Sequence, residues 1–334
     1  MGVTFMVYSL AWGSALALMA SGLSLYYSVS KVANFAHGSY VSMGLLAYLL
    51  AIAFAHWGSK ITGFGIDHYA IFNISNLWAL IPAFLVAGLV SLASFAGIFW
   101  PLMKRGATPL QLLVASIGLM FVLRFLMYIV AGSMNWITLW TPGSTTYHIL
   151  GVRITLAEIL SFVLLALVAG LIALLETKTL IGVSLRAIAS NPSLAEASGI
   201  DSFKVQALAW FLGGGFAGLG GVLMFIFTGP PGGRPIVELG WMNLLSIFAA
   251  AVLGGLGSFY GTIIAALILG IAFNQAAAWF TIYLNVSSSL ALLIPFGITL
   301  LTLLFFPQGL AGINWRKLVN KIRITRVEEE VVRR

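Results

Sequence analysis

Residues 77–102 read LWALIPAFLVAGLVSLASFAGIFWPL and contain no charged side chain. An α-helix rises about 1.5 Å per residue, so about 20 residues cross the hydrocarbon core of a bilayer. This stretch is therefore long enough and apolar enough to cross a membrane as one helix. In lipid a helix satisfies all of its backbone hydrogen bonds within the segment, and this requirement dictates the fold class of the whole chain.

Similar apolar segments recur along the chain, at residues 5–29, 39–56, 110–131, 155–176, 203–228, 239–256, 258–280 and 288–306. Two of them, 39–56 and 239–256, are short, so each is either a short span or a broken or re-entrant one. We predict an all-α, polytopic transmembrane helical bundle of about 8–10 spans. It occupies residues 1–314 and is followed by a charged cytoplasmic tail over residues 315–334.

Composition agrees with a membrane protein. Of the 334 residues 60% are hydrophobic and 8% are charged, whereas a soluble domain carries about 25% charged residues. The net charge of +8 does not indicate nucleic-acid binding, because the basic residues lie in short loops and near the C-terminus. The chain has no cysteine, which excludes disulfide and zinc–thiolate chemistry. No basic residue precedes the first apolar segment, so we expect a retained span rather than a cleaved signal peptide.

The distribution of basic residues predicts the orientation of the bundle. With the loop at 178–204 in the cytoplasm, alternation of the spans leaves only Lys60, Arg153 and Arg234 outside. The N-terminus is then external and the C-terminus cytoplasmic, in a multi-pass protein of the cell (plasma or inner) membrane. The basic residues on the cytoplasmic side, apart from those after Trp315, are Lys31, Lys104, Arg105, Lys178, Arg186 and Lys204.

Arg124 is the exception, because it lies within an apolar segment. Its long side chain either extends toward the external end of that segment, which we expect, or belongs to a solute pathway.

Two functional classes lack their sequence features. No lysine follows a glycine, so the phosphate-binding GxxxxGK[ST] loop is absent and the chain does not hydrolyse ATP by that route. The acidic residues all fall in loops, in the tail or near the ends of spans. We therefore expect no carboxylate in the middle of a span, which argues against a carboxylate-driven secondary carrier.

The segment VANFAHGS, residues 32–39, lies directly between two apolar segments and contains Asn34, His37 and Gly38. Asparagine and glycine disfavour a continuous helix. Irregular backbone at membrane depth is tolerated only where it is buried in protein or lines a wet cavity. The segment is therefore either a helix break close to a translocation path or a short cytoplasmic turn.

The longest internal loop, residues 178–204, reads KTLIGVSLRAIASNPSLAEASGIDSFK. Asn191 followed by Pro192 is typical of a helix N-cap with proline at the first helical position. A short helix at 193–198 should then end at Gly199 in the left-handed conformation. The loop is either a docking helix for a cytoplasmic partner or a solvated amphipathic loop, with charge on Arg186, Glu196 and Asp201.

A third segment, residues 250–270, is rich in glycine, at Gly254, Gly255, Gly257 and Gly261. Small residues allow helix backbones to approach closely in lipid. The segment predicts either tight helix packing or a helix break.

Together these segments resemble the permease subunits of branched-chain amino-acid ABC transporters, of the first of that family's two permease types. The resemblance is carried in order by Asn-Phe-Ala-His-Gly at 34–38, Arg-Ala-x-Ala-x-Asn-Pro-x-x-Ala-x-x-x-Gly-Ile at 186–200, Val-Leu-Gly-Gly-Leu-Gly-Ser at 252–258 and Pro-x-Gly-Leu at 307–310. It covers nearly the whole chain. Trp100-Pro101 departs from the Tyr-Arg-Pro of many relatives, and residues 132–153 have no clear counterpart.

The resemblance implies a transport subunit that is not itself an enzyme. It implies a second homologous permease, two cytoplasmic ATPases that bind ATP-Mg, and an external solute-binding protein, with lipid around the spans and no cofactor on this chain. It also implies that 186–201 is the coupling helix and that the solute is a branched-chain or related small amino acid. Urea or amides, carried by other members, and a stand-alone secondary transporter or channel remain the alternatives.

Overall fold

The computed structural model describes residues 2–55, 74–133, 138–139, 145–149, 151–227, 234–283, 290, 293–305 and 309–312. The predicted tail at 315–334 lies outside these residues. Every predicted apolar segment contains a helix. The helices of the first half are α1 (Val3–Ser30), α2 (His37–Ala55), η2 (Ile74–Ala79), α3 (Leu80–Ser94), the π-helical turn η3 (Phe95–Phe99), α4 (Trp100–Lys104) and α5 (Pro109–Ser133).

The second half continues in the same way, with two short helices between its first two long ones. Its helices are α6 (Leu156–Lys178), α7 (Leu180–Ser190), α8 (Pro192–Ala197), α9 (Ser202–Phe227), α10 (Leu239–Gly254), α11 (Phe259–Tyr283), α12 (Leu293–Phe305) and η5 (Leu310–Gly312). Within the described residues, seven helices are long and apolar enough to cross a membrane: α1, α2, the continuous unit Ile74–Lys104, α5, α6, α9 and α11. The all-α polytopic fold is therefore confirmed, and α10 and α12 are shorter apolar helices.

The two short segments behave differently from each other. Segment 39–56, which could have been broken, forms the unbroken helix α2 of 19 residues. Segment 239–256 forms α10, which has only 16 residues. The chain enters α10 through buried, non-helical residues, Ile236 and Val237.

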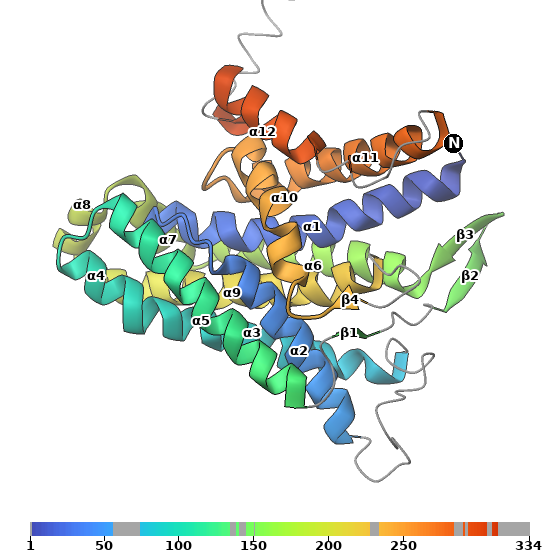
Figure 1. Ribbon diagram of the computed structural model, residues 1–334. Helices are drawn as coiled ribbons and strands as arrows, with labels where there is room; N and C mark the ends of the chain where they lie inside the picture. Colours follow the sequence, from blue (N-terminus) through green and yellow to red (C-terminus); the bar gives the residue numbers. More distant parts are fainter. Residues whose placement is uncertain are drawn as a thin grey trace, which may run out of the picture.

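Short strands lie at the connections between helices. Strands β2 (Thr146–Ile149) and β3 (Val152–Thr155) form an antiparallel hairpin immediately before α6. Strand β1 (Thr138–Leu139) pairs with β4 (Arg234–Pro235). The β2–β3 hairpin lies at the same end of the bundle as the N-terminus, whereas α4 and α8 lie at the opposite end (Figure 1).

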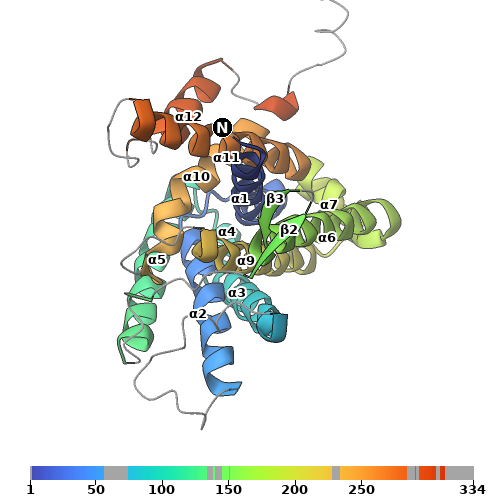
Figure 2. The same cartoon turned by 90° about the vertical axis from the view of Figure 1, so that its right-hand side faces the viewer.

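Helices α1 and α9 form the centre of the bundle, and the view along it shows α5 on one side of them and α6 on the other (Figure 2). In α9 83% of the most apolar 18-residue stretch is buried inside the protein, whereas in α5 the corresponding share is 22%. Helix α9 can be surrounded so closely because its glycines have no side chain. A Cβ added to Gly22 of α1 would collide with the backbone of Gly213 in α9, and the reverse also holds.

We therefore expect Gly22→Val to destabilise the bundle by about 1–3 kcal/mol, because overpacking forces two backbones apart. The matched control is Gly170→Val in α6, where a new Cβ meets no atom within 4 Å. Thermal unfolding of the purified protein in detergent measures both. Equal midpoints for the two variants would contradict the central role of the α1–α9 contact.

Candidate functional site: a helix break and an ion pair inside the bundle

The break expected at Asn34 and His37 is present and buried. Helix α1 ends at Lys31, whose φ of 55° is left-handed, and α2 begins at His37. The Asn34 and His37 side chains are both 0% exposed. Asn34 satisfies the irregular backbone, because its Oδ1 accepts a hydrogen bond from the Ala36 N–H at 2.9 Å while its Nδ2 donates to the Tyr40 hydroxyl at 3.2 Å.

His37 connects the break to α1 through both ring nitrogens. Nε2 lies 2.8 Å from the Met19 carbonyl oxygen, which can only accept, so we assign the ring hydrogen to Nε2. Nδ1 then accepts from the Tyr26 hydroxyl at 3.0 Å. Each hydrogen-bonding group of the imidazole has a partner, and the Tyr26 ring stacks on Trp210 of α9 with centroids 4.3 Å apart.

These contacts place the start of α2 deep in the bundle. Met19 precedes Ser30, the last residue of α1, by a distance of about 16 Å at 1.5 Å per residue. Helix α2 therefore starts well inside the bundle rather than at its end. This position favours the helix break over the short cytoplasmic turn, since the polar side chains lie where irregular backbone needs protein partners.

The start of α10 meets the start of α2 at this depth. A Cβ on Gly38 would press on the backbone of Gly240 at 2.9 Å, so only glycine allows this approach. The Ser42 hydroxyl donates to the Val237 carbonyl at 2.9 Å and accepts from the Gly240 N–H at 2.9 Å. One serine thus satisfies backbone groups on both sides of the α10 start.

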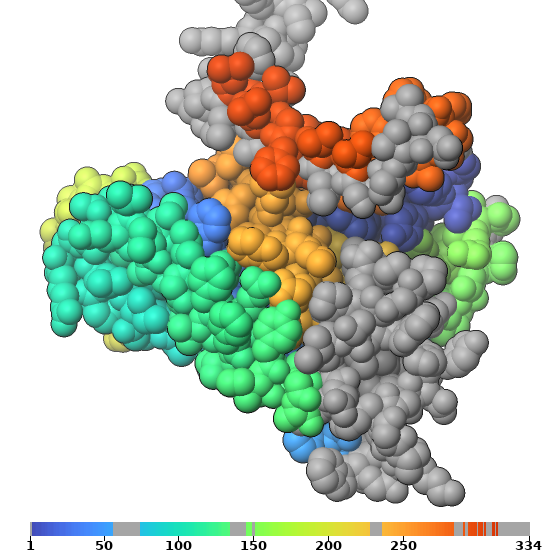
Figure 3. All heavy atoms as spheres, in the orientation of Figure 1, coloured from blue at the N-terminus to red at the C-terminus, as the bar shows by residue number. Residues whose placement is uncertain are grey.

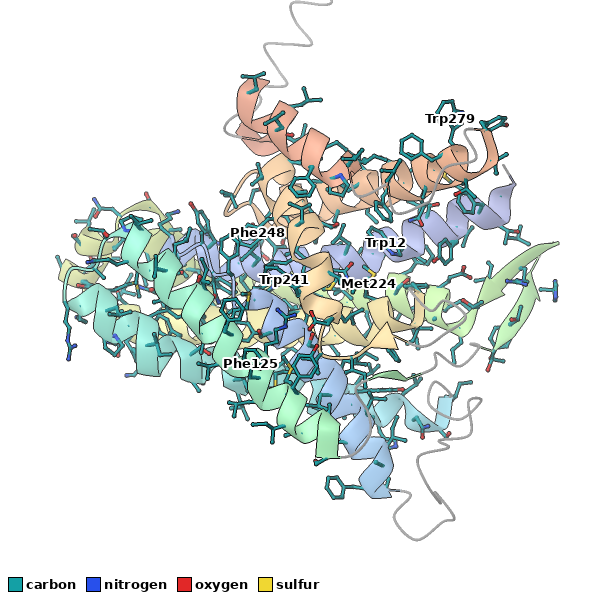
Figure 4. All side chains as sticks on the ribbon, in the orientation of Figure 1. Trp12, Phe125, Met224, Trp241, Phe248 and Trp279 are labelled. Atoms are coloured by element: carbon teal, nitrogen blue, oxygen red, sulfur yellow. The ribbon has the colours of Figure 1, made fainter. Side chains whose placement is uncertain are left out.

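An ion pair lies beside this junction. Arg124 of α5 donates to Glu238, the N-cap residue of α10, from Nε at 2.9 Å and from Nη2 at 2.6 Å to each carboxylate oxygen. The Tyr128 hydroxyl donates to the same carboxylate. The Arg124 guanidinium also lies 5.6 Å from the ring centroid of Trp241, a residue of α10 near the middle of the bundle (Figure 4).

The ion pair adds to two sequence expectations. Whichever way its side chain extends, the Arg124 guanidinium binds Glu238 and is not free in solvent. Arg124 precedes Ser133, the end of α5, by about 14 Å. Glu238 precedes α10 as its N-cap residue, at the end of a helix as expected, but its side chain is only 12% exposed. The apolar pattern does not reveal that the chain enters the interior of the bundle at Ile236 and Val237, before α10 begins.

A small hollow with a cavity volume of about 10 Å³, room for about one water molecule, adjoins the ion pair. Helices α2, α5 and α10 contribute its walls, and α10 reaches the molecular surface between α5 and α12 (Figure 3). The lining residues are Gly38, Ser39, Met120, Arg124, Val237, Trp241 and Leu244. Gly38 of the sequence-predicted site is thus brought together with two residues, Arg124 and Glu238, that the prediction did not include.

The loop at 178–204 forms two helices, α7 and α8, at the opposite end of the bundle from the β2–β3 hairpin (Figure 1). Asn191 caps α8 as predicted, since its Oδ1 accepts from the Leu194 N–H at 3.1 Å, and Pro192 is the first helical residue. Gly199 ends the turn with a φ of 84°. The Ile200 N–H donates to the Ala195 carbonyl at 3.1 Å, which closes the turn.

The charged residues of this loop hold its ends. Arg186 donates to the Glu176 carbonyl and so joins α7 to α6. Asp201 caps α9, because its Oδ1 accepts from the Lys204 N–H at 3.2 Å and its Oδ2 lies 3.1 Å from the Lys204 ammonium. The backbone N–H and the ammonium of Lys204 lower the pKa of the Asp201 carboxyl. Glu196 is exposed and Leu194 is 64% exposed, so α8 presents both a charged and an apolar side chain at its surface.

The four glycines of the third segment occupy the connection between α10 and α11. A Cβ on Gly254 would collide with the backbone of Gly261, and the reverse also holds. Gly255 and Gly257 have φ of 99° and 89°, in the region that favours glycine. The segment therefore combines tight packing with a turn, and it lies apart from the hollow.

Comparison with known proteins gives a consistent result. Residues 5–303 match the family described as branched-chain amino acid transport system / permease component. The probable branched-chain amino acid transport permease protein LivH of Methanocaldococcus jannaschii is 31% identical over 325 residues, which are 93% of this chain and 92% of that protein.

Two bacterial relatives are nearly as similar. The high-affinity branched-chain amino acid transport system permease protein LivH of Salmonella typhimurium is 30% identical over 90% of this chain and 92% of its own length. The corresponding protein BraD of Pseudomonas aeruginosa is 28% identical over 92% of this chain and 94% of its own length.

The His37 contacts predict a structural cost of removing the ring. We expect His37→Ala to lower the free energy of unfolding by about 1–3 kcal/mol, because it removes the buried hydrogen bonds of the ring to the Tyr26 hydroxyl and the Met19 carbonyl. The control is His148→Ala, at an exposed position in β2. Thermal unfolding in nanodiscs measures both variants, and an unchanged midpoint for His37→Ala would contradict the assigned hydrogen bonds.

Proposed function

Because the chain belongs to the branched-chain amino acid transport system / permease component family, we propose that it is the membrane-spanning permease subunit of an ATP-binding-cassette importer. The solute is a branched-chain or related small amino acid, which is the class that the names of the relatives give. The observation that carries the proposal is the family match over residues 5–303, which includes every described membrane helix.

The complete importer contains four further subunits of three kinds in this proposal. A second homologous permease lies beside this one in the membrane, two cytoplasmic ATPases bind ATP-Mg, and an external binding protein delivers the solute. The absence of a GxxxxGK[ST] loop supports the separate ATPases. The N-terminus and the β2–β3 hairpin face outward, whereas α7, α8 and the C-terminus face the cytoplasm, in agreement with the basic residues.

The α7–α8 segment is the coupling element that contacts an ATPase. Its support is geometric, since Asn191, Gly199 and Asp201 fix both ends of α8 and the start of α9. The exposed Leu194 and Glu196 give it a surface for a partner. Asn34, His37 and Gly38 border the solute path, because the break that they form adjoins the hollow beside Arg124.

The principal test is uptake by cells that express this chain together with the neighbouring ATPase, permease and binding-protein genes. We expect uptake of radiolabelled L-leucine, L-isoleucine or L-valine that requires the binding protein and an active ATPase. We also expect the ATPases to copurify with the chain. Uptake of urea or acetamide but not of amino acids would favour the first alternative, and uptake without ATPase a secondary transporter. This measurement decides between the importer and the second alternative.

The left-handed residue at the end of α8 gives a specific test of coupling. We expect Gly199→Val to strain this turn by about 1–2 kcal/mol, because β-branched residues tolerate positive φ poorly. Solute-stimulated ATP hydrolysis by the reconstituted importer should fall. Gly151→Val, at a φ of 78° in the β2–β3 hairpin, introduces the same strain at the other end and should leave hydrolysis unchanged. Full stimulation in Gly199→Val would exclude α8 as the coupling element.

Orientation can be tested directly because the chain has no native cysteine. We expect a cysteine at Ser190 to react with a membrane-impermeant maleimide only after the cells are permeabilised. A cysteine at the exposed Arg153 should react in intact cells. Reaction of the Ser190→Cys variant in intact cells would reverse the proposed topology.

A further inference from the structure

Arg124 lines a small hollow where two helices start inside the bundle, and its ion-pair partner Glu238 lies beside that hollow. Charged side chains at membrane depth are costly, and they persist where they pair with each other or serve a solute pathway. These two side chains pair with each other, and both remain partly exposed, 24% for Arg124 and 12% for Glu238. Among the residues that the structure describes, the other ion pair joins Lys204 to Asp201 near the exposed coupling segment.

Neighbouring side chains hold both charges in place. Trp241 lies against the guanidinium and Tyr128 donates to the carboxylate. Two charged groups of opposite sign are therefore presented side by side in fixed positions. The hollow is also lined by the apolar residues Val237, Leu244 and Met120, together with the polar Ser39.

This arrangement matches the chemistry of an aliphatic α-amino acid. A guanidinium binds a carboxylate through two parallel hydrogen bonds, which suits the α-carboxylate, and a carboxylate accepts from an α-ammonium. An arriving zwitterion replaces one ion pair with two, so neither protein charge is left unpaired. The hollow must widen to admit the solute, and its apolar lining residues then contact the aliphatic side chain. Uncharged solutes such as urea or an amide offer no such exchange.

We propose that Arg124 and Glu238 form a transient binding station for the zwitterionic backbone of an α-amino acid during its passage through the bundle. The proposal rests on the proposed function and adds the residues that recognise the substrate. Binding at the station is weak, because the protein's own ion pair competes with the solute. Weak binding suits transport, in which a solute must leave as readily as it enters.

The alternative role for the pair is a clamp that joins α5 to α10. The two roles predict different results for double variants. If the pair only joins α5 to α10, the double variant should transport better than either single variant, since an unpaired buried charge causes most of the loss in a single variant. If the pair binds the substrate, the double variant should transport as slowly as the single variants, because the zwitterion then meets no charge.

The experiment measures initial uptake of radiolabelled L-leucine in cells that express the complete importer. The variants are Arg124→Gln, Glu238→Gln, their double combination and the charge-exchanged double variant Arg124→Glu/Glu238→Arg. Arg153→Gln, the same substitution at an exposed arginine outside the bundle, is the control. Copurification with the ATPases and the thermal unfolding midpoint report assembly and folding for each variant.

We expect at least a fivefold loss of uptake in each single variant and in both double variants, with normal assembly in at least one double variant. The charge-exchanged variant keeps an ion pair but reverses the positions of carboxylate and ammonium relative to the apolar wall, so it should fold and transport slowly. Uptake reduced less than fivefold in either double variant would overturn the station, as would failure of both to accumulate. Absence of leucine uptake by the wild-type importer would instead overturn the proposed function and this proposal with it.

Discussion

The protein depends on satisfying backbone hydrogen bonds at places inside the bundle where helices stop and start. Water is absent from the hydrocarbon region, so each free N–H and C=O group there needs a partner from the protein. At the break after α1, Asn34 supplies a partner for the Ala36 N–H, and the His37 ring attaches the segment to the Met19 carbonyl in α1. At the start of α10, Ser42 of α2 supplies them for both Val237 and Gly240. The two irregular segments therefore stabilise each other, and neither can be rearranged without the other.

The contacts between glycines determine where this junction lies. Gly22 against Gly213 brings α1 and α9 together, and Gly38 against Gly240 brings α2 and α10 together. Dispersion contacts and lipid entropy rather than hydrophobic burial favour helix association in lipid, so close backbone approach matters more than in water. Because α1 and α9 hold the Tyr26 and Trp210 rings in a stack, His37 binds a rigid surface. The packing of α1 against α9 therefore determines where the break lies.

Local features of the fold could be predicted from the sequence, whereas distant contacts could not. The helical spans follow from apolar length, and the caps of α8 follow from Asn191, Pro192 and Gly199, which act on residues within a few positions. The break at Asn34 was predictable for the same reason. Arg124 and Glu238 are 114 residues apart, and nothing in the apolar pattern links them. The start of α10 inside the bundle was equally hidden, because a short apolar segment is compatible with several depths.

The site has a consequence for how such a bundle can move. Helix α5 is mostly exposed along its length, yet it is joined to α10 by an ion pair with three donated hydrogen bonds to Glu238 from Arg124. Any solute group that competes for Arg124 weakens this connection, whereas the Ser42 contacts between α2 and α10 remain. Ligand binding can shift a conformational equilibrium only through different interactions with the two states. The ion pair offers such a difference at the start of α10, and α10 leads through the Gly254–Gly261 contact to α11. Solute recognition and helix movement can therefore share one set of charges.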